Sequence, residues 1–195
     1  MEIIAHRINS SKELTYIPSD LGVEIDIRTD NNQLILSHDP FQKGELFEEW
    51  LDHFQHKTLI LNLKEEGLEI RVLELMHKFD ISNFFFLDQS FPFLVKTFKK
   101  GIKNCAVRIS EYESLDTAIN LKGKVEWVWI DFFTKFPLNF DEVNILKKLN
   151  YKLCLVSPEL QGYDLDKIIQ LKEMLKNESI WVDAVCTKEY KLWKS

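Results

Sequence analysis

The chain has 195 residues, a formal net charge of −6 and a hydrophobic content of 45%. This composition is typical of a globular protein with a sizeable core, and the length suits one domain. The 25 Lys and Arg residues are dispersed along the chain. That argues against binding to nucleic acid or to an anionic membrane, because both need a clustered basic face. An anionic small molecule would need local positive groups, since the overall field repels it.

The first residues and the cysteines predict a cytoplasmic protein. The start, MEIIAHR, has no basic segment followed by a long apolar stretch, so no signal peptide is expected. No apolar run reaches the length of a membrane span. Cys105, Cys154 and Cys186 lie in separate apolar runs without a CxxC motif, so we expect three reduced, buried thiols.

Apolar runs and helix-period segments alternate along the chain. The predicted strands, in chain order, are Ile3–His6, Val23–Arg28, Leu59–Lys64, Phe84–Leu87, Ala106–Ile109, Trp127–Phe132, Lys152–Val156 and Ala184–Thr187. A further strand, Leu34–Ser37, forms a hairpin with the second through the turn Asn31-Asn32. The predicted helices are a short helix or turn at Ser10-Ser11, then Glu45–Phe54, Leu68–Phe79, Phe91–Lys100, Leu115–Leu121, Asp141–Leu149 and Leu165–Leu175.

The alternation predicts an α/β fold with a parallel sheet. Nearly all of the strands are continuous apolar runs, which is typical of parallel strands covered by helices. An open doubly wound sheet and a closed barrel both fit this pattern. Eight strands favour a compact (β/α)8 TIM barrel with a small hairpin at the second strand, although such barrels usually have about 250 residues. No linker divides the chain, so residues 1–195 are expected to form a single domain.

Polar residues collect where the predicted strands end, the edge at which barrel enzymes carry their active sites. Glu24 and Asp26 are two residues apart on one strand and therefore share a face. Two like charges on one face repel each other unless a cation lies between them. A divalent cation that prefers hard oxygen ligands, Mg²⁺ or Ca²⁺, would hold them together. The alternative is a strand face exposed to solvent.

Other residues at the same edge suit phosphate chemistry. Arg7 and Lys64 would provide positive charge for a phosphate group. His6 and His38, on neighbouring strands, would act as base and acid across it. Each residue alone has an ordinary structural explanation, such as a loop histidine or a surface ion pair. Their convergence on one edge is what favours a site.

The segments IIAHR, VEIDIRTD…LILSHDP and LILNLK, in this order, resemble the glycerophosphodiester phosphodiesterase family. The family pattern is HRG on the first strand, ExD on the second, HD after the hairpin and ExK on the third. The resemblance is dense over residues 1–64 and continues afterwards as topology. It implies a (β/α)8 barrel of the phosphatidylinositol-phospholipase-C-like type, and an enzyme of lipid metabolism that hydrolyses a small-molecule phosphodiester.

The resemblance also implies roles for individual residues. His6 and His38 would be the acid/base pair, Arg7 and Lys64 would contact the phosphate, and Glu24 and Asp26 would bind the metal.

The chain departs from the family pattern at several places, and the Pro-Glu-Asn segment that usually follows the first strand is absent. Ile8 replaces the glycine of HRG, and Asn62 replaces the third-strand glutamate that completes the metal site. An asparagine oxygen can bind a cation but brings no charge, so we expect a weak ligand, with Glu159 or Asp131 as candidates to compensate. The insertion after HD is also missing, which implies an open pocket suited to a bulky headgroup or to closure by a second subunit of a homo-oligomer.

Two other functions remain open from the sequence. A non-catalytic barrel that binds a phosphorylated ligand, or acts as a scaffold, would use the same binding residues. The retained histidine pair favours an enzyme, because binding alone needs no acid and base. A barrel isomerase or aldolase with Lys64 as a Schiff-base amine is a weaker alternative, since Glu65 and Glu66 follow immediately.

Overall fold

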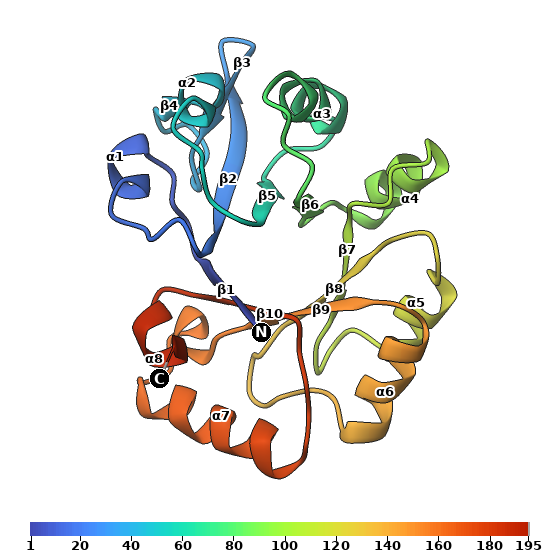
Figure 1. The fold of residues 1–195 in the computed structure, drawn as a ribbon. Coiled ribbons are helices and arrows are strands. Elements are labelled where there is room, and N and C mark those ends of the chain that lie inside the picture. Colours follow the sequence, from blue (N-terminus) through green and yellow to red (C-terminus); the bar gives the residue numbers. More distant parts are fainter. Residues whose placement is uncertain (195) are drawn as a thin grey trace. The chain divides into compact units, whose positions relative to one another are not determined.

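The computed structural model describes residues 1–194. The chain divides into two compact units. The N-terminal unit is Ala5–Ile102, and the C-terminal unit consists of Met1–Ile4 and the chain from Lys103 onward. Strand β1, Glu2–Ala5, crosses the boundary between them. Figure 1 shows the order of the elements in each unit.

The N-terminal unit is built on a mixed sheet. Its strands are β2 (Gly22–Asp30), β3 (Gln33–Leu36), β4 (Glu45–Leu46), β5 (Leu59–Leu63) and β6 (Phe84–Leu87), in the spatial order β4-β3-β2-β5-β6. Strands β2, β5 and β6 are parallel, and β3 returns antiparallel to β2 as the predicted hairpin. The hairpin turn is formed by Asn31 and Asn32, which both have positive φ angles of 45° and 64°. Asparagine tolerates this conformation better than most residues.

The helices of this unit follow the predicted pattern with one exception. They are α1 (Ser11–Leu14), α2 (Phe47–Leu51), α3 (Glu69–Lys78) and α4 (Phe91–Lys99). The predicted helix Glu45–Phe54 begins too early, because Glu45 and Leu46 form strand β4 against β3, and the observed helix ends at Leu51. Gly44 makes this pairing possible, since a Cβ atom there would lie 2.2 Å from the carbonyl oxygen of Leu36. The chain is therefore held extended beside β3 before α2 begins.

The C-terminal unit carries a parallel sheet. Its strands are β7 (Ala106–Ile109), β8 (Trp127–Ile130), β9 (Lys152–Val156) and β10 (Ala184–Thr187), each paired with the next, and β1 adjoins β10. The helical segments are α5 (Leu115–Asn120), α6 (Phe140–Lys148), η1 (Pro158–Gln161), α7 (Asp166–Asn177) and α8 (Tyr190–Lys194). Helices α5, α6 and α7 lie on the same side of strands β8–β10 in Figure 1. The η1 and α8 segments are too short to leave a periodic signal in the sequence.

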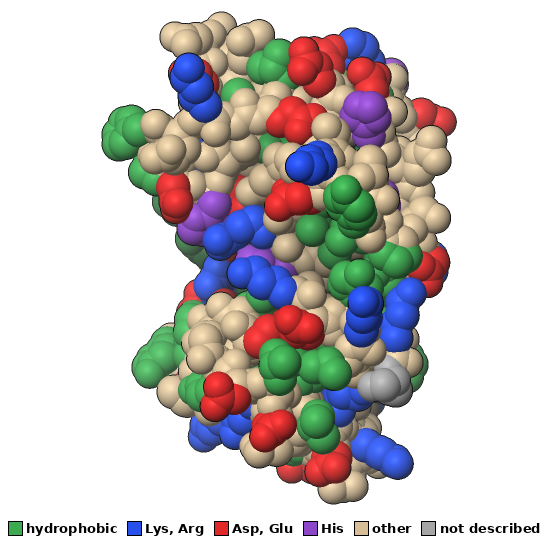
Figure 2. Space-filling view, turned by 90° about the vertical axis from the view of Figure 1, so that its left-hand side faces the viewer, with side chains coloured by type: hydrophobic (Ala, Val, Ile, Leu, Met, Phe, Trp, Pro, Cys, Tyr) green, Lys and Arg blue, Asp and Glu red, His purple; other side chains and the backbone are tan. Residues whose placement is uncertain are grey.

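These elements confirm a mixed α/β fold with the predicted strand order. The closed eight-stranded barrel and the single domain stay predictions. Cys105, Cys154 and Cys186 are buried and are not joined in disulfide bonds, as expected. Among residues 1–194, no helix combines the length and the apolar composition needed to cross a membrane. Acidic, basic and apolar side chains are interspersed on the face drawn in Figure 2.

A carboxylate fixes the loop that follows β8. Glu111 accepts hydrogen bonds from the backbone N–H groups of Phe133, Thr134 and Lys135, and from the Thr134 hydroxyl. Partial burial acts to raise the pKa of Glu111, but the bonds from Lys135 and Thr134 outweigh it and lower the pKa to about 2. The ionised carboxylate therefore stabilises the loop.

This bonding predicts a pH-dependent stability. The pKa of Glu111 is near 4.5 in the unfolded chain and about 2 in the folded protein. Its contribution is therefore complete above about pH 4.5 and is lost as the pH falls through about 2. Because the group is only partly buried, we expect Glu111→Gln to lower the free energy of unfolding at pH 7 by only about 1 kcal/mol.

Urea unfolding at a series of pH values checks this expectation. The difference between the wild-type protein and Glu111→Gln should shrink as the pH is lowered from 5 toward 2. Glu173→Gln, at an exposed position of α7, is the matched control. A difference for Glu111→Gln that stays constant down to pH 2 would contradict the assigned role.

Candidate active site

Two buried carboxylates on β2 form the centre of the candidate site. Glu24 is 0% exposed and Asp26 is 1% exposed, while Val23, Ile25 and Ile27 pack into the core from the other face of the strand. The predicted shared face is therefore present, but the alternative of a solvent-exposed strand face is wrong. A buried carboxylate is costly unless it is paired and hydrogen-bonded. The partners of these two residues therefore define what the site can do.

Glu24 is held by the segment that follows β1 and by β5. The backbone N–H of Arg7 donates to Glu24 Oε2 at 2.7 Å, and the side-chain amide of Asn62 donates to Glu24 Oε1 at 2.9 Å. His6 Nε2 lies 3.8 Å from Glu24 Oε2. Arg7 has a positive φ of 57°, a conformation that is costly for a side chain of this size. The strained turn directs the Arg7 N–H to the carboxylate.

The pKa of Glu24 is raised from its ordinary value to about 7. Burial is the main cause, because the charged form loses its hydration, and the charge of Asp26 acts in the same direction. The bond from Asn62, the charge of Lys64 and the bond from Arg7 oppose the shift. The environment of Glu24 is therefore short of positive charge.

Asp26 is the better neutralised of the two carboxylates. Lys64 Nζ lies 3.1 Å from Asp26 Oδ1, and Arg7 Nε lies 3.4 Å from Asp26 Oδ2. Asn9 makes a reciprocal pair of bonds: its amide donates to Asp26 Oδ2 at 2.8 Å, and its oxygen accepts the Asp26 N–H at 2.9 Å. Lys64 also lies 3.5 Å from Asp88 Oδ2, at the end of β6. Both of these protein cations therefore pair with Asp26.

These contacts bear on the predicted roles of Lys64. A Schiff-base amine needs a desolvated site or a neighbouring cation to make it nucleophilic. Lys64 instead lies between the carboxylates of Asp26 and Asp88. This is the setting of a cation that neutralises carboxylate charge. Its contact with a substrate phosphate, which the family resemblance implies, stays a prediction.

His38 follows β3, and its backbone is tied to the same end of β2. The preceding N–H, of Ser37, donates to the carbonyl of Asp26 at 3.0 Å, and Arg28 Nε donates to the carbonyl of His38 at 3.0 Å. The ring Nδ1 lies 2.8 Å from Asp39 Oδ1. This bond is the main cause that lowers the pKa of Asp39. The His38 side chain is 38% exposed, compared with 16% for His6.

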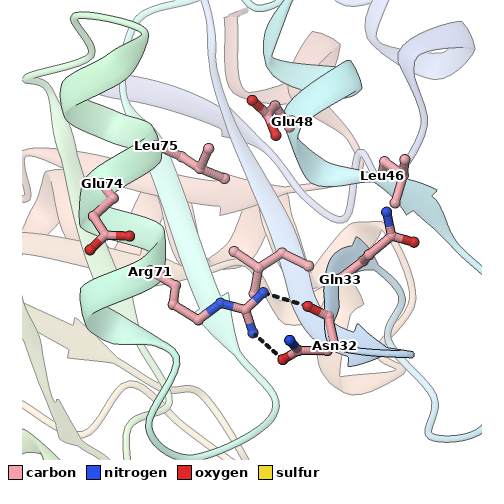
Figure 3. A pocket seen from close by; sticks show the side chains of 8 residues that line it. Asn32, Gln33, Leu46, Glu48, Arg71, Glu74 and Leu75 are labelled. Atoms are coloured by element: carbon pink, nitrogen blue, oxygen red, sulfur yellow. Dashed lines mark hydrogen bonds between the residues drawn. The ribbon is translucent and has the colours of Figure 1, made fainter.

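The hairpin that leads to His38 is braced at its tip by α3. The Arg71 guanidinium donates to the backbone carbonyl of Asn32 at 2.7 Å and reaches the side-chain oxygen of Asn32 at 3.5 Å (Figure 3). A cavity of about 260 Å³ lies beside this contact, lined by residues that include Leu46, Glu48 and Arg71. The bond from Arg71 fixes the turn from which β3 runs back toward His38.

The donor set is compatible with a divalent cation. Within residues 1–194, no three His, Cys, Asp or Glu side chains are placed to hold a metal ion together. A cation would therefore rest on Glu24 and Asp26 and on the amide oxygen of Asn62. That oxygen is buried and accepts no hydrogen bond from the described residues. An orphaned buried oxygen beside two carboxylates has the chemistry of a hard-cation ligand.

Glu159 and Asp131, the two candidates to compensate for Asn62, belong to the C-terminal unit and are hydrogen-bonded there. Glu159 accepts bonds from the hydroxyls of Ser157 and Thr187 and from the N–H of Lys188. Asp131 is paired with Arg108, whose Nη1 lies 2.7 Å from Asp131 Oδ2. A role for either residue as a metal ligand stays a prediction.

Sequence reasoning missed Asn9 as a part of the site. It belongs to the loop after β1, where the sequence carries no periodic signal and the family pattern is interrupted by Ile8. Its two bonds to Asp26 became visible only with the loop in three dimensions. The other residues at the centre of the cluster, Glu24, Asp26 and Lys64, were predicted.

The comparisons with known proteins support the resemblance at the level of fold. No protein-family model and no curated protein sequence matches the chain. Among solved structures, a proposed glycerophosphodiester phosphodiesterase from Galdieria sulphuraria matches with a TM-score of 0.73 and 17% identity, over 99% of this chain and 96% of that chain.

Two further structures agree. A glycerophosphodiester phosphodiesterase from Agrobacterium tumefaciens str. C58 matches with a TM-score of 0.70 and 12% identity, over 99% of this chain and 98% of that chain. A glycerophosphoryl diester phosphodiesterase from Parabacteroides distasonis matches with a TM-score of 0.66 and 13% identity, over 99% and 85% of the two chains. The chain therefore has the fold of the glycerophosphodiester phosphodiesterases, as the motifs on its first three strands predict.

Proposed function

We propose that the protein is a phosphoric diester hydrolase that acts on a glycerophosphodiester or on another polyol- or sugar-linked phosphodiester. The observation that carries this proposal is the cluster formed by His6, Arg7, Glu24, Asp26 and Lys64 at the ends of their strands. It combines cations for a phosphate group with buried carboxylates and a histidine, on a fold shared with phosphodiesterases.

In the proposed mechanism the substrate phosphate lies against Arg7 and Lys64, which balance the charge that grows on its oxygens. One histidine, His6 or His38, takes the proton of the attacking water or of a neighbouring substrate hydroxyl. The new P–O bond forms as the bond to the leaving alcohol breaks, and the other histidine gives its proton to the alcohol oxygen. Asp39 holds Nδ1 of His38, which leaves Nε2 for proton transfer.

A divalent cation, Mg²⁺ or Ca²⁺, would be held by Glu24 and Asp26 with Asn62 as a neutral ligand. When bound, such a cation supplies positive charge to the phosphoryl oxygens. The buried oxygen of Asn62 and the shortage of positive charge around Glu24 support this assignment. With two carboxylates as ligands, binding should be weak until a substrate phosphate adds an oxygen.

We also propose that the chain is a single cytoplasmic domain whose sheets close into a (β/α)8 barrel. The eight strands β1, β2 and β5–β10 alternate with helices as such a barrel requires. One cooperative urea transition, seen at once by tryptophan fluorescence and by circular dichroism, is the expected result. Two separated transitions would contradict a single domain.

The experiment that tests the function is release of alcohol from a panel of glycerophosphodiesters and sugar-linked phosphodiesters, with Mg²⁺ or Ca²⁺ and with an EDTA control. We expect turnover that depends on the added cation. A panel without turnover, at protein concentrations that would detect a slow enzyme, would overturn the proposal.

A second candidate is a non-catalytic protein that binds a phosphorylated ligand. Asn62 favours it, because the metal site has one carboxylate fewer than the family pattern and its amide is bonded to Glu24. Both candidates share Arg7 and Lys64. Calorimetric binding of glycerol 3-phosphate without turnover of any diester would identify this second function.

A further inference from the structure

An acidic cavity opens beside Lys64. It has a volume of about 200 Å³ and lies between the segments that follow β5 and β6. Four carboxylates line it, from Glu65, Glu66, Glu69 and Asp88, compared with one ammonium group, that of Lys64. Glu65 is also paired with Arg28, at 3.7 Å, which still leaves more carboxylates than cations. All of these residues belong to the N-terminal unit. The cavity is therefore negatively charged at the place where it meets the proposed phosphate site.

One of these carboxylates is buried without a cation. Glu69, at the start of α3, is only 6% exposed. The hydrogen bond that it accepts comes from Gln89 Nε2, at 2.9 Å, and within residues 1–194 no Lys, Arg or His lies in ion-pair distance. A buried carboxylate of this kind is normally paired with a positive charge. Because Glu69 has no such partner among the described residues, we infer that a ligand supplies the positive charge.

Two neutral acceptors in the same cavity also lack partners. Gln89 uses its amide nitrogen for Glu69 and Thr97, and its buried oxygen accepts no hydrogen bond from the described residues. The buried hydroxyl of Ser90 has no partner there either. Ser90 precedes α4 and would ordinarily cap it, but its side chain makes no capping bond. Buried polar atoms without partners are rare and call for an explanation.

The missing group must therefore be a cation that donates hydrogen bonds. A metal ion suits the cavity less well, because Glu69 is the one buried carboxylate among its lining residues, whereas Mg²⁺ and Ca²⁺ normally collect several carboxylate and carbonyl oxygens. A quaternary ammonium has no N–H to donate and is recognised by aromatic faces. The Phe93 ring, which lines the cavity, is already covered by Lys96 Nζ at 4.0 Å. A primary ammonium satisfies both the charge and the free acceptors.

We propose that this cavity binds the primary ammonium group of an amino alcohol esterified to the substrate phosphate, with Glu69 as the residue that determines specificity. The inference rests on the proposed phosphodiester hydrolysis. The charges follow the order that such a zwitterionic substrate needs: Lys64 for the phosphate, then Asp88, 3.5 Å from Lys64, and Glu69 for the ammonium. Glycerophosphoethanolamine has this arrangement of charges.

The first test compares kcat/KM for three substrates: glycerophosphoethanolamine, glycerophosphocholine and glycerophosphoglycerol. We expect the ethanolamine diester to be preferred at least tenfold over each of the others. Glu69→Gln should lower kcat/KM for this diester by about tenfold or more, the effect of losing a hydrogen bond to a charged group, and leave the glycerol diester within about twofold. Ser90→Ala should lower kcat/KM for the ethanolamine diester by a smaller factor. Glu74→Gln, on the exposed side of α3, should leave kcat/KM for both diesters unchanged.

The possible results separate this inference from the proposed function. Equal kcat/KM values for the three diesters, or an equal loss for all of them in Glu69→Gln, would overturn the ammonium site and leave hydrolysis standing. If no diester is cleaved, the proposed hydrolysis is overturned. Calorimetric binding of O-phosphoethanolamine and of glycerol 3-phosphate then tests the ammonium site by itself. Tenfold tighter binding of O-phosphoethanolamine than of glycerol 3-phosphate, lost in Glu69→Gln, supports the ammonium site. Equal affinities for the two compounds overturn the ammonium site.

Discussion

His38→Ala is expected to lower kcat for a glycerophosphodiester by about 10²–10⁴-fold, because general acid or base catalysis contributes about this factor. The loss should not come from unfolding. The His38 ring is 38% exposed, and its hydrogen bond is made to the exposed side chain of Asp39. His6→Ala is expected to have an effect of the same size. Its ring lies 3.8 Å from Glu24, so its replacement also removes a positive group near the buried carboxylate when the ring is protonated.

The roles of the two histidines can be separated with a substrate whose leaving group is 4-nitrophenolate. This anion leaves without a proton, so the variant that lacks the general acid should recover most of its activity on it. The variant that lacks the general base should remain slow on both substrates. His77→Ala, at an exposed position of α3, is the matched control and should behave as wild type. Full activity of both His6→Ala and His38→Ala on a natural diester would remove the mechanism and leave the fold untouched.

The fold could be predicted from the sequence wherever a strand or helix carries its own periodicity. Buried runs such as LILNL and FFFL predicted β5 and β6 almost to the residue. Strand β4 could not be predicted, because Glu45 and Leu46 are extended through pairing with β3 and close approach at Gly44. Local sequence does not encode such a contact. The pairing with β3 therefore determines the extended conformation of Glu45 and Leu46.

In the candidate site, too, local sequence predicts some features and the tertiary structure determines the others. The alternation of Glu24 and Asp26 with apolar residues was sufficient to predict that their side chains share a face. Their nearly complete burial, and their partners, depend on a loop of irregular backbone in which Arg7 has a positive φ and Asn9 reaches Asp26. The sequence suggested a metal as the counter-charge of the acid pair. The structure brings Lys64 and Arg7 to it as well.

Asn62→Glu is expected to change stability and metal affinity in opposite directions. In the wild-type protein the Asn62 amide donates to Glu24 Oε1, and a glutamate would place a carboxylate there instead. The lost hydrogen bond and the repulsion between buried carboxylates should lower the free energy of unfolding by about 1–3 kcal/mol without metal. The same third carboxylate should tighten binding of Mg²⁺ or Ca²⁺, because added negative oxygen ligands favour hard cations. Added cation should then restore the lost stability.

Glu24→Gln is the complementary change, and it should weaken cation binding sharply and abolish turnover, since the site then keeps one carboxylate, that of Asp26. Calorimetric titration of the three proteins with Mg²⁺ and with Ca²⁺, together with thermal unfolding at each concentration, separates affinity from stability. Gln55→Glu adds the same charge as Asn62→Glu at an exposed position before β5 and should alter neither quantity. If Asn62→Glu and Glu24→Gln both leave the affinity unchanged, the acid pair binds no metal. Lys64 and Arg7 would then be its counter-charges, and the protein that binds a phosphorylated ligand without cleaving it would become the leading function.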